Sequence, residues 1–204
     1  MRFQKTNTIE VPAFHIKLGG GFVLLFALIY FFNDTGFLLA LCPAVLIHEL
    51  GHVLFMIFFG AYPRQLKATL SGFSIDYSGV ISEKQEMLTA LAGPAFGLAF
   101  SLLCAELGRL WSSDYLLMCA GLGFVINFFN LLPALPLDGG RVCSFALCVL
   151  LGEDKAQHVM RIVGLLIAIL LLTSGLYFIA IGFGFALFLA GIWLFILQQN
   201  KSCK

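Results

Sequence analysis

The sequence predicts an all-α polytopic membrane protein, with about six transmembrane helices and a small β-hairpin or sheet on the cytoplasmic side. Of its 204 residues, 60% are hydrophobic and only 11% are charged, whereas a soluble domain is about half apolar and about one quarter charged. A small soluble domain must also expose much of its surface to water. We therefore expect one membrane domain over residues 1–204, without a soluble appendage.

Six apolar segments are long enough to cross a bilayer. They cover residues 18–33, 36–60, 85–106, 114–132, 156–173 and 175–198. Short turns at Asn33-Asp34-Thr35 and Ser174-Gly175 separate the first two and the last two. The first segment has no small-residue cleavage pattern, so we expect it to be a retained helix rather than a signal peptide.

The basic residues predict the orientation of the chain. With the N-terminus in the cytoplasm, Arg109 alone among the 12 lysines and arginines falls on the outer face, as the positive-inside rule requires. Both termini are then cytoplasmic in this multi-pass protein, for which the bacterial cell membrane is the expected location. No block of basic residues is present, which argues against a nucleic-acid partner.

Two segments on the cytoplasmic side have strand patterns. Residues 64–82 alternate apolar and polar side chains around Ser71-Gly72, which predicts a β-hairpin. Residues 9–16 are typical of a further strand. The alternatives are two ordered loops, or a small sheet at the membrane surface whose edge pairs with an extended peptide.

The second apolar segment contains His48-Glu49-Leu50-Gly51-His52. Histidines at i and i+4 share one face of a helix, where both can bind one Zn²⁺ ion, and the intervening Glu49 suits a general base. Ionisable groups deep in a membrane segment are functional by default. The structural alternative is a polar cluster that joins helices by hydrogen bonds.

Catalytic zinc usually has three protein ligands, so a third must be found. His15 and His158 lie outside the apolar segments, and Glu106 lies at the outer end of one. Asp138 follows Pro133 and Pro136, which break the fourth helix, and irregular backbone at membrane depth can line a water-filled cavity. Asp138 is the best candidate; it could also, or only, cap a short helix over residues 139–151, because capping and ligation can use different oxygens.

The motif His48–His52, together with Leu137-Asp138-Gly139 in the stretch 130–141, resembles the site-2 protease family of intramembrane zinc metalloproteases. Ala92-Gly93-Pro94 and the strand-like start of the chain resemble that family too. The resemblance covers most of residues 9–152. It implies that Asp138 is the third ligand of a single zinc ion, and that Asn130 positions the substrate or its oxyanion.

The compact form is similar to the bacterial branch that contains the sporulation protease IVFB, but we expect no C-terminal regulatory domain here. The resemblance implies a membrane-embedded or membrane-associated protein substrate, such as a pro-sigma factor in sporulation, and it leaves room for a regulatory membrane partner. We expect the active site to open to the cytoplasm, and Glu49 to act as general base.

Other polar and small residues have plainer interpretations. Asn127 is expected to make a helix–helix hydrogen bond, and Gly93 and Gly97 to allow close packing. Pro43 is expected to kink its helix. The six cysteines show no metal-binding or disulfide spacing and behave as small apolar residues; they are Cys42, Cys104, Cys119, Cys143, Cys148 and Cys203.

Three alternative functions remain. A protease for soluble or prenylated ends would use a later glutamate as third ligand, and no apolar segment after residue 107 contains one. A metal-binding or transport protein could use the same ligands, but it would need polar groups across the outer half of the membrane. A non-proteolytic relative would be expected to lack Glu49, which this chain retains.

Overall fold

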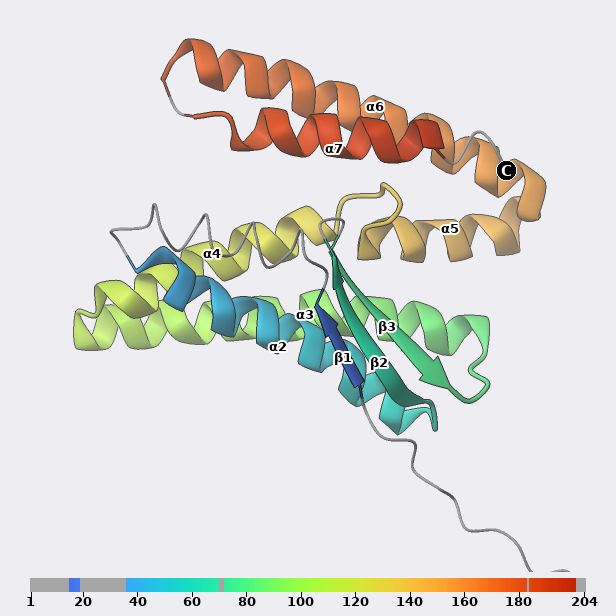
Figure 1. Cartoon of the computed structure of the whole chain (residues 1–204), viewed down its shortest axis with the longest axis horizontal. Coiled ribbons are helices and arrows are strands. Elements are labelled where there is room, and N and C mark those ends of the chain that lie inside the picture. Colours follow the sequence, from blue (N-terminus) through green and yellow to red (C-terminus); the bar gives the residue numbers. More distant parts are fainter. Residues whose placement is uncertain (1–14, 19–35, 70–71, 183, 201–204) are drawn as a thin grey trace, which may run out of the picture.

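The computed structural model describes residues 15–18, 36–69, 72–182 and 184–200. Within these ranges the chain forms six helices and one three-stranded sheet (Figure 1). The helices are α2 (Phe37–Phe58), α3 (Glu83–Trp111), α4 (Asp114–Asn130), α5 (Asp138–Leu151), α6 (Glu153–Ala180) and α7 (Ala186–Asn200). The mostly helical fold confirms the predicted class. The predicted helix over residues 18–33 lies almost entirely outside the described residues.

Helices α2, α3 and α4 pack against one another and lie side by side in Figure 1. Helix α3 begins with a capping box, in which Ser82 and Gln85 satisfy each other's backbone N–H groups. It ends at Trp111; the next residue, Ser112, has a φ of 51° and reverses the chain, and the Ser113 hydroxyl then caps α4. These caps fix a tight turn between two long apolar helices.

The sheet has the order β1-β2-β3, with strands β1 (His15–Leu18), β2 (Tyr62–Thr69) and β3 (Gly72–Ser78). Strands β2 and β3 form an antiparallel hairpin, which confirms the hairpin predicted for residues 64–82. Strand β1 pairs with β2 in parallel. The strand predicted for residues 9–16 overlaps β1 at its end only, and residues 9–14 lie outside the described part of the chain.

Helix α4 ends at Asn130, and residues 131–137 form an irregular turn before α5. Pro133 and Pro136 lie in this turn, as expected, because proline cannot donate a helical hydrogen bond. The first residue of this irregular turn packs directly against α5, because a Cβ atom on Gly139 would collide with the carbonyl of Leu131. We call residues 131–137 the proline turn.

Helices α6 and α7 form a hairpin that packs on α5 and on the proline turn. The turn predicted at Ser174-Gly175 is wrong, because both residues lie inside α6 and the chain reverses after Ala180. The Ser174 hydroxyl donates to the carbonyl of Leu170 within the helix. Gly175 allows α7 to pack closely against α6, because a Cβ atom at this position would lie 2.5 Å from the backbone nitrogen of Phe188.

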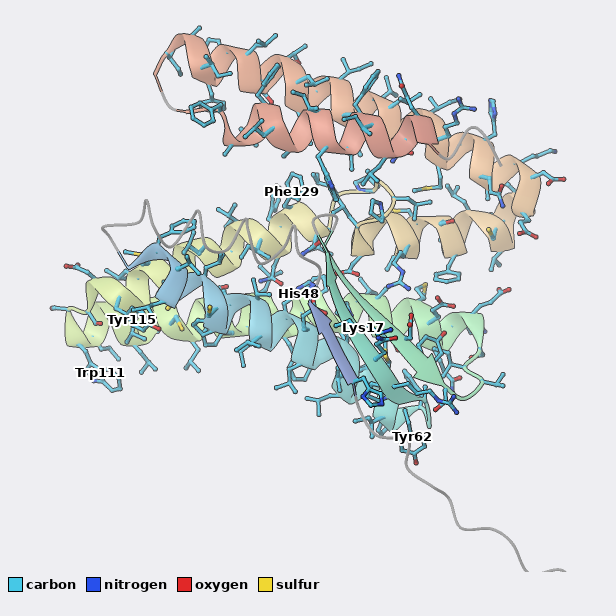
Figure 2. All side chains as sticks on the ribbon, in the orientation of Figure 1. Lys17, His48, Tyr62, Trp111, Tyr115 and Phe129 are labelled. Carbon is cyan, nitrogen blue, oxygen red and sulfur yellow. The ribbon has the colours of Figure 1, made fainter. Side chains whose placement is uncertain are left out.

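Helices α2, α3 and α6 are long and apolar enough to cross a membrane, and α4 and α7 are shorter apolar helices. Figure 2 places Trp111 and Tyr115 at one end of the helix layer and Tyr62 toward the other, with His48 between them. All three aromatic side chains are exposed. Tryptophan and tyrosine favour the two membrane–water interfaces, so this distribution suits a protein whose site lies at membrane depth.

Candidate metal centre

Helix α2 supplies the two histidines of the motif. Because His48 and His52 are four residues apart, their imidazoles extend from the same face, and the ring centroids lie 4.8 Å apart in an edge-to-face arrangement. Both side chains are buried, with exposed fractions of 4% and 7%. Buried imidazoles need defined partners.

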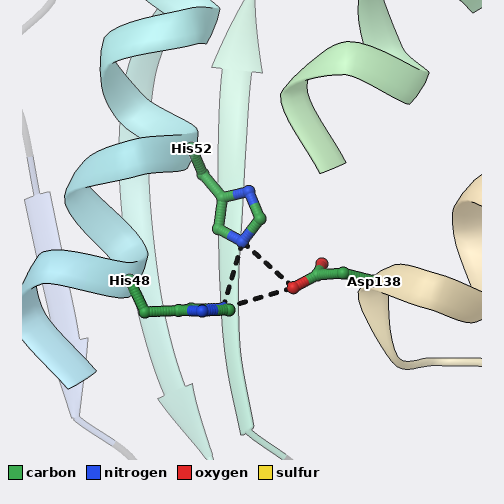
Figure 3. A group of neighbouring side chains, drawn as sticks. All are labelled: His48, His52 and Asp138. Atoms are coloured by element: carbon green, nitrogen blue, oxygen red, sulfur yellow. Dashed lines mark hydrogen bonds and ion pairs between the residues drawn. The ribbon is translucent and has the colours of Figure 1, made fainter. Parts of the chain in front are cut away.

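Asp138 completes a triangle of ligand atoms (Figure 3). Its Oδ2 lies 3.2 Å from the Nε2 of His48 and 3.2 Å from the Nε2 of His52. The two Nε2 atoms are themselves 3.2 Å apart. Three side chains from α2 and α5 thus converge on one point.

Asp138 does not cap α5, so that alternative is wrong. Leu137 is the residue before the first turn, and it makes no side-chain capping bond. Asp138 is the first residue of the helix, where a carboxylate is favoured by the helix dipole. Its side chain is therefore available to the histidines.

The outer nitrogens of both imidazoles are held by hydrogen bonds. His52 Nδ1 donates to the carbonyl of Thr89 at 2.8 Å, and this oxygen can only accept. His48 Nδ1 lies 2.7 Å from Asn127 Oδ1. The Asn127 amide donates to the carbonyl of Gly123 at 2.6 Å, which turns Oδ1 toward His48, so the neutral form of each ring presents the lone pair of Nε2 to Asp138.

The arrangement fits a zinc ion. Two neutral Nε2 atoms and a carboxylate oxygen bring three lone pairs together without a proton between them, which is favourable only around a cation. Ligand atoms at about 2.0–2.1 Å from a tetrahedral zinc are about 3.3–3.4 Å apart, close to the 3.2 Å sides of this triangle. Nitrogen and carboxylate ligands with hydrogen-bonded outer nitrogens are typical of catalytic zinc.

Glycines on α3 make room for this centre. A Cβ atom on Gly93 would collide with the imidazole of His52, and one on Gly97 with the amide of Asn127. A Cβ on Gly51 would lie 2.6 Å from the carbonyl oxygen of Ala92. The predicted packing role of Gly93 and Gly97 is thus more specific than expected, because their neighbours belong to the metal centre.

Asn127 is the residue whose role sequence reasoning underestimated. It makes the expected interhelical hydrogen bond, but its partner is the His48 imidazole. A polar amide within an apolar helix, one turn before Asn130, is the signal that could have identified it. The Asn127 side chain is fully buried, with 0% exposure.

Two further sequence candidates are Glu49 on α2 and Asn130 on α4. Glu49 is half-buried and directly follows His48 on α2. Asn130 is the last residue of α4 and is half-buried.

The remaining ligand candidates are elsewhere. His15 is exposed on β1 and His158 is exposed on α6. Glu106 forms an exposed ion pair with Arg109 at 2.8 Å, near the end of α3. Within the described residues, the group that could hold a metal ion is His48, His52 and Asp138.

The chain is similar to known peptidases. Residues 105–172 match the family model of Peptidase family M50. A zinc metalloprotease of Methanocaldococcus jannaschii is 24% identical over 138 residues, which are 65% of this chain and 40% of that protein. The chain thus aligns with less than half the length of this curated relative.

The fold is similar to a solved structure, a site-2 protease from Methanocaldococcus jannaschii. The TM-score is 0.69 with 21% sequence identity, over 93% of this chain and 91% of the other. The segment that matches the family model includes the proline turn and Asp138. The chain thus matches peptidase family M50 over residues 105–172 and has the fold of a solved site-2 protease.

Proposed function

We propose that this protein is an intramembrane zinc endopeptidase that hydrolyses peptide bonds of membrane-embedded or membrane-associated proteins. The observation that carries the proposal is the buried triangle of His48, His52 and Asp138, in which both histidines, and Glu49 between them, belong to a helix long enough to span a membrane. The enzyme class is also that of the curated relative, a zinc metalloprotease.

His48, His52 and Asp138 would hold the zinc ion. Bound there, zinc would supply a Lewis acid that polarises a substrate carbonyl and makes a water molecule acidic near neutral pH. Asn127 and Thr89 fix the orientation of the two imidazoles, so the ligands are arranged before the metal binds.

Glu49 is the proposed general base and acid. Its carboxylate accepts a proton from the attacking water and later donates it to the departing amine of the cleaved peptide. Its position supports this role, because Glu49 directly follows His48 on α2 and is only partly buried. Asn130, at the end of α4, is proposed to donate a hydrogen bond to the substrate carbonyl or the oxyanion.

The substrate must be extended when it is cleaved, because helical backbone does not expose its peptide bonds. Among the described residues, the sheet order β1-β2-β3 makes β1 and β3 the outer strands, and an extended segment could add to one of them. Strand β3 leads directly toward α3, which holds His52 through Thr89. We propose that the substrate pairs with β3 before it reaches the metal centre.

The distribution of basic residues supports a site that opens to the cytoplasm, with both termini on that side of a bacterial cell membrane. Arg109, assigned to the outer face, is paired with Glu106. The finer proposal, processing of a pro-sigma factor in sporulation with a membrane regulator, rests on the resemblance to the IVFB branch.

The test compares the wild type with Glu49→Gln, purified in detergent together with a single-span candidate substrate. Both proteins should contain about one zinc per chain, because Glu49 is not a ligand. Cleavage by the variant should fall by at least about a hundredfold, which is the usual contribution of a general base. Undiminished cleavage by Glu49→Gln would refute the mechanism, whereas zinc-free wild type would refute the metal centre.

A further inference from the structure

Gln198 is a buried polar residue near the end of α7, an otherwise apolar helix. Its exposed fraction is 3%. Its Nε2 donates a hydrogen bond of 2.6 Å to the carbonyl of Leu135, which lies in the proline turn. The last helix of the described chain therefore contacts the segment that leads to Asp138, although Leu135 precedes Gln198 by 63 positions in the sequence.

The fold provides a place for this amide. Gly164 on α6 faces it, and a Cβ atom at that position would lie 2.6 Å from the Gln198 carboxamide carbon and Nε2. The surrounding contact between the α6–α7 hairpin and the proline turn is apolar, with Leu137 and Leu194 among its buried residues. A single directional bond within an apolar contact fixes relative position better than apolar contacts alone, because an unpaired buried amide is costly.

The proline turn is short and tightly folded between Leu135 and Asp138. The Leu137 N–H donates to the carbonyl of Ala134 at 2.9 Å. A Cβ atom on Gly140 would collide with the backbone at Ala134 and Leu135. The first helical turn of α5 therefore packs directly against the proline turn. A displacement of Leu135 must therefore displace the start of α5, including Asp138.

We propose that Gln198 is a positioning residue of the metal centre, which holds Asp138 at its place in the triangle through the carbonyl of Leu135. The inference rests on the proposed function, because it takes Asp138 to be a metal ligand. Catalytic ligands must be held to within about 0.5 Å of the productive geometry, and α2 positions only two of the three. The α6–α7 hairpin thus supplies part of the support for the third.

The test uses the purified full chain loaded with Co²⁺, whose visible absorption reports the number and geometry of its ligands. Gln198→Leu removes the donor at similar volume, and Gln199→Leu, at the exposed neighbouring position, is the matched control. Gln198→Leu should bind Co²⁺ about tenfold more weakly, the lower end of the effect of outer partners of metal ligands, and should alter the absorption bands. Gln199→Leu should match the wild type in both.

Gly164→Ala provides a second route to the same contact, because the added methyl group displaces the end of a flexible side chain. It should weaken Co²⁺ binding as Gln198→Leu does, and the double variant should be no weaker than Gln198→Leu alone, since the two changes remove one interaction. If Gln198→Leu does not fold, the Co²⁺ affinity of Gly164→Ala tests the positioning role.

If Gln198→Leu binds Co²⁺ with the affinity and the spectrum of the wild type, the positioning role is overturned and the metal centre stays intact. The same result in Gly164→Ala overturns it if Gln198→Leu does not fold. A wild type that binds no Co²⁺ would overturn the proposed metal function, and the positioning role with it.

Discussion

Asn127 Oδ1 lies 2.7 Å from His48 Nδ1, so a residue of α4 orients a histidine of α2. Two neighbours constrain the position of the Asn127 amide. Gly97 on α3 leaves space for the amide, and the carbonyl of Gly123 accepts from its nitrogen. Three helices therefore determine how one imidazole faces the metal position.

Replacing Asn127 with leucine should weaken zinc binding by about 10–100-fold, because the His48 ring loses the acceptor that fixes its orientation. Competition with a chromophoric chelator measures the affinity. Asn130→Ala is the control, because Asn130 is proposed to act on the substrate; it should retain zinc and lose cleavage. Equal zinc affinities of Asn127→Leu and the wild type would show that the hydrogen bond does not support the centre.

Gly93→Ala should abolish stoichiometric zinc binding, since its methyl group would occupy the position of the His52 imidazole. The matched control is Gly121→Ala on α4, where an added Cβ meets nothing within 4 Å. Gly121→Ala should bind one zinc per chain and unfold like the wild type. Zinc content by elemental analysis distinguishes the two, and a zinc-loaded Gly93→Ala protein would contradict the geometry at His52.

The sequence was sufficient to predict the class of fold and the proximity of His48 and His52. Apolar run length predicts membrane helices, and the i, i+4 spacing places His48 and His52 on one face. Spacing alone left Asp138 between ligation and capping, because a residue after a proline turn can do either. The contacts of its carboxylate with both imidazoles, which only the three-dimensional structure shows, favour ligation.

The features that were missed depend on neighbours that are distant in sequence. Ser174-Gly175 reads locally as a turn, but the glycine is needed where Phe188 of α7 approaches α6. Asn127 reads as a general helix–helix contact, because nothing within α4 indicates that its partner is a histidine of α2. Tertiary contact decides the role of such residues, and local pattern does not encode it.

Asp138→Ala should reduce the zinc content to a small fraction of one ion per chain, because two imidazoles alone form an incomplete site. Glu106→Ala is the control carboxylate: it removes the exposed partner of Arg109 and should leave the zinc content unchanged. Full zinc occupancy in Asp138→Ala would remove Asp138 from the ligand set and would refute the triangle as a metal centre.

Tyr77 on strand β3 is close enough to Glu86, near the start of α3, and to Arg141, near the start of α5, for their charges to act on it. Arg141 and Glu86 form an ion pair of 3.6 Å, and both are partly exposed, so the pair should contribute less than about 1 kcal/mol. Burial, followed by the charge of Glu86, raises the pKa of Tyr77 above its ordinary value of 10.0, and Arg141 opposes the rise. The phenol thus reports where β3 lies relative to α3 and α5.

Glu86→Gln should lower the pKa of Tyr77 toward 10.0, because it removes one negative charge, and Arg141→Gln should raise it further. Phenolate absorbance, taken as the difference from Tyr77→Phe, measures both shifts. The folded state favours the protonated phenol, so this contribution to stability is complete below pH 10 and is lost as the pH rises through the pKa of the folded state. A Tyr77 pKa unchanged by both variants would place β3 away from the start of α5, and would remove the support for a substrate strand guided by β3 to the metal centre.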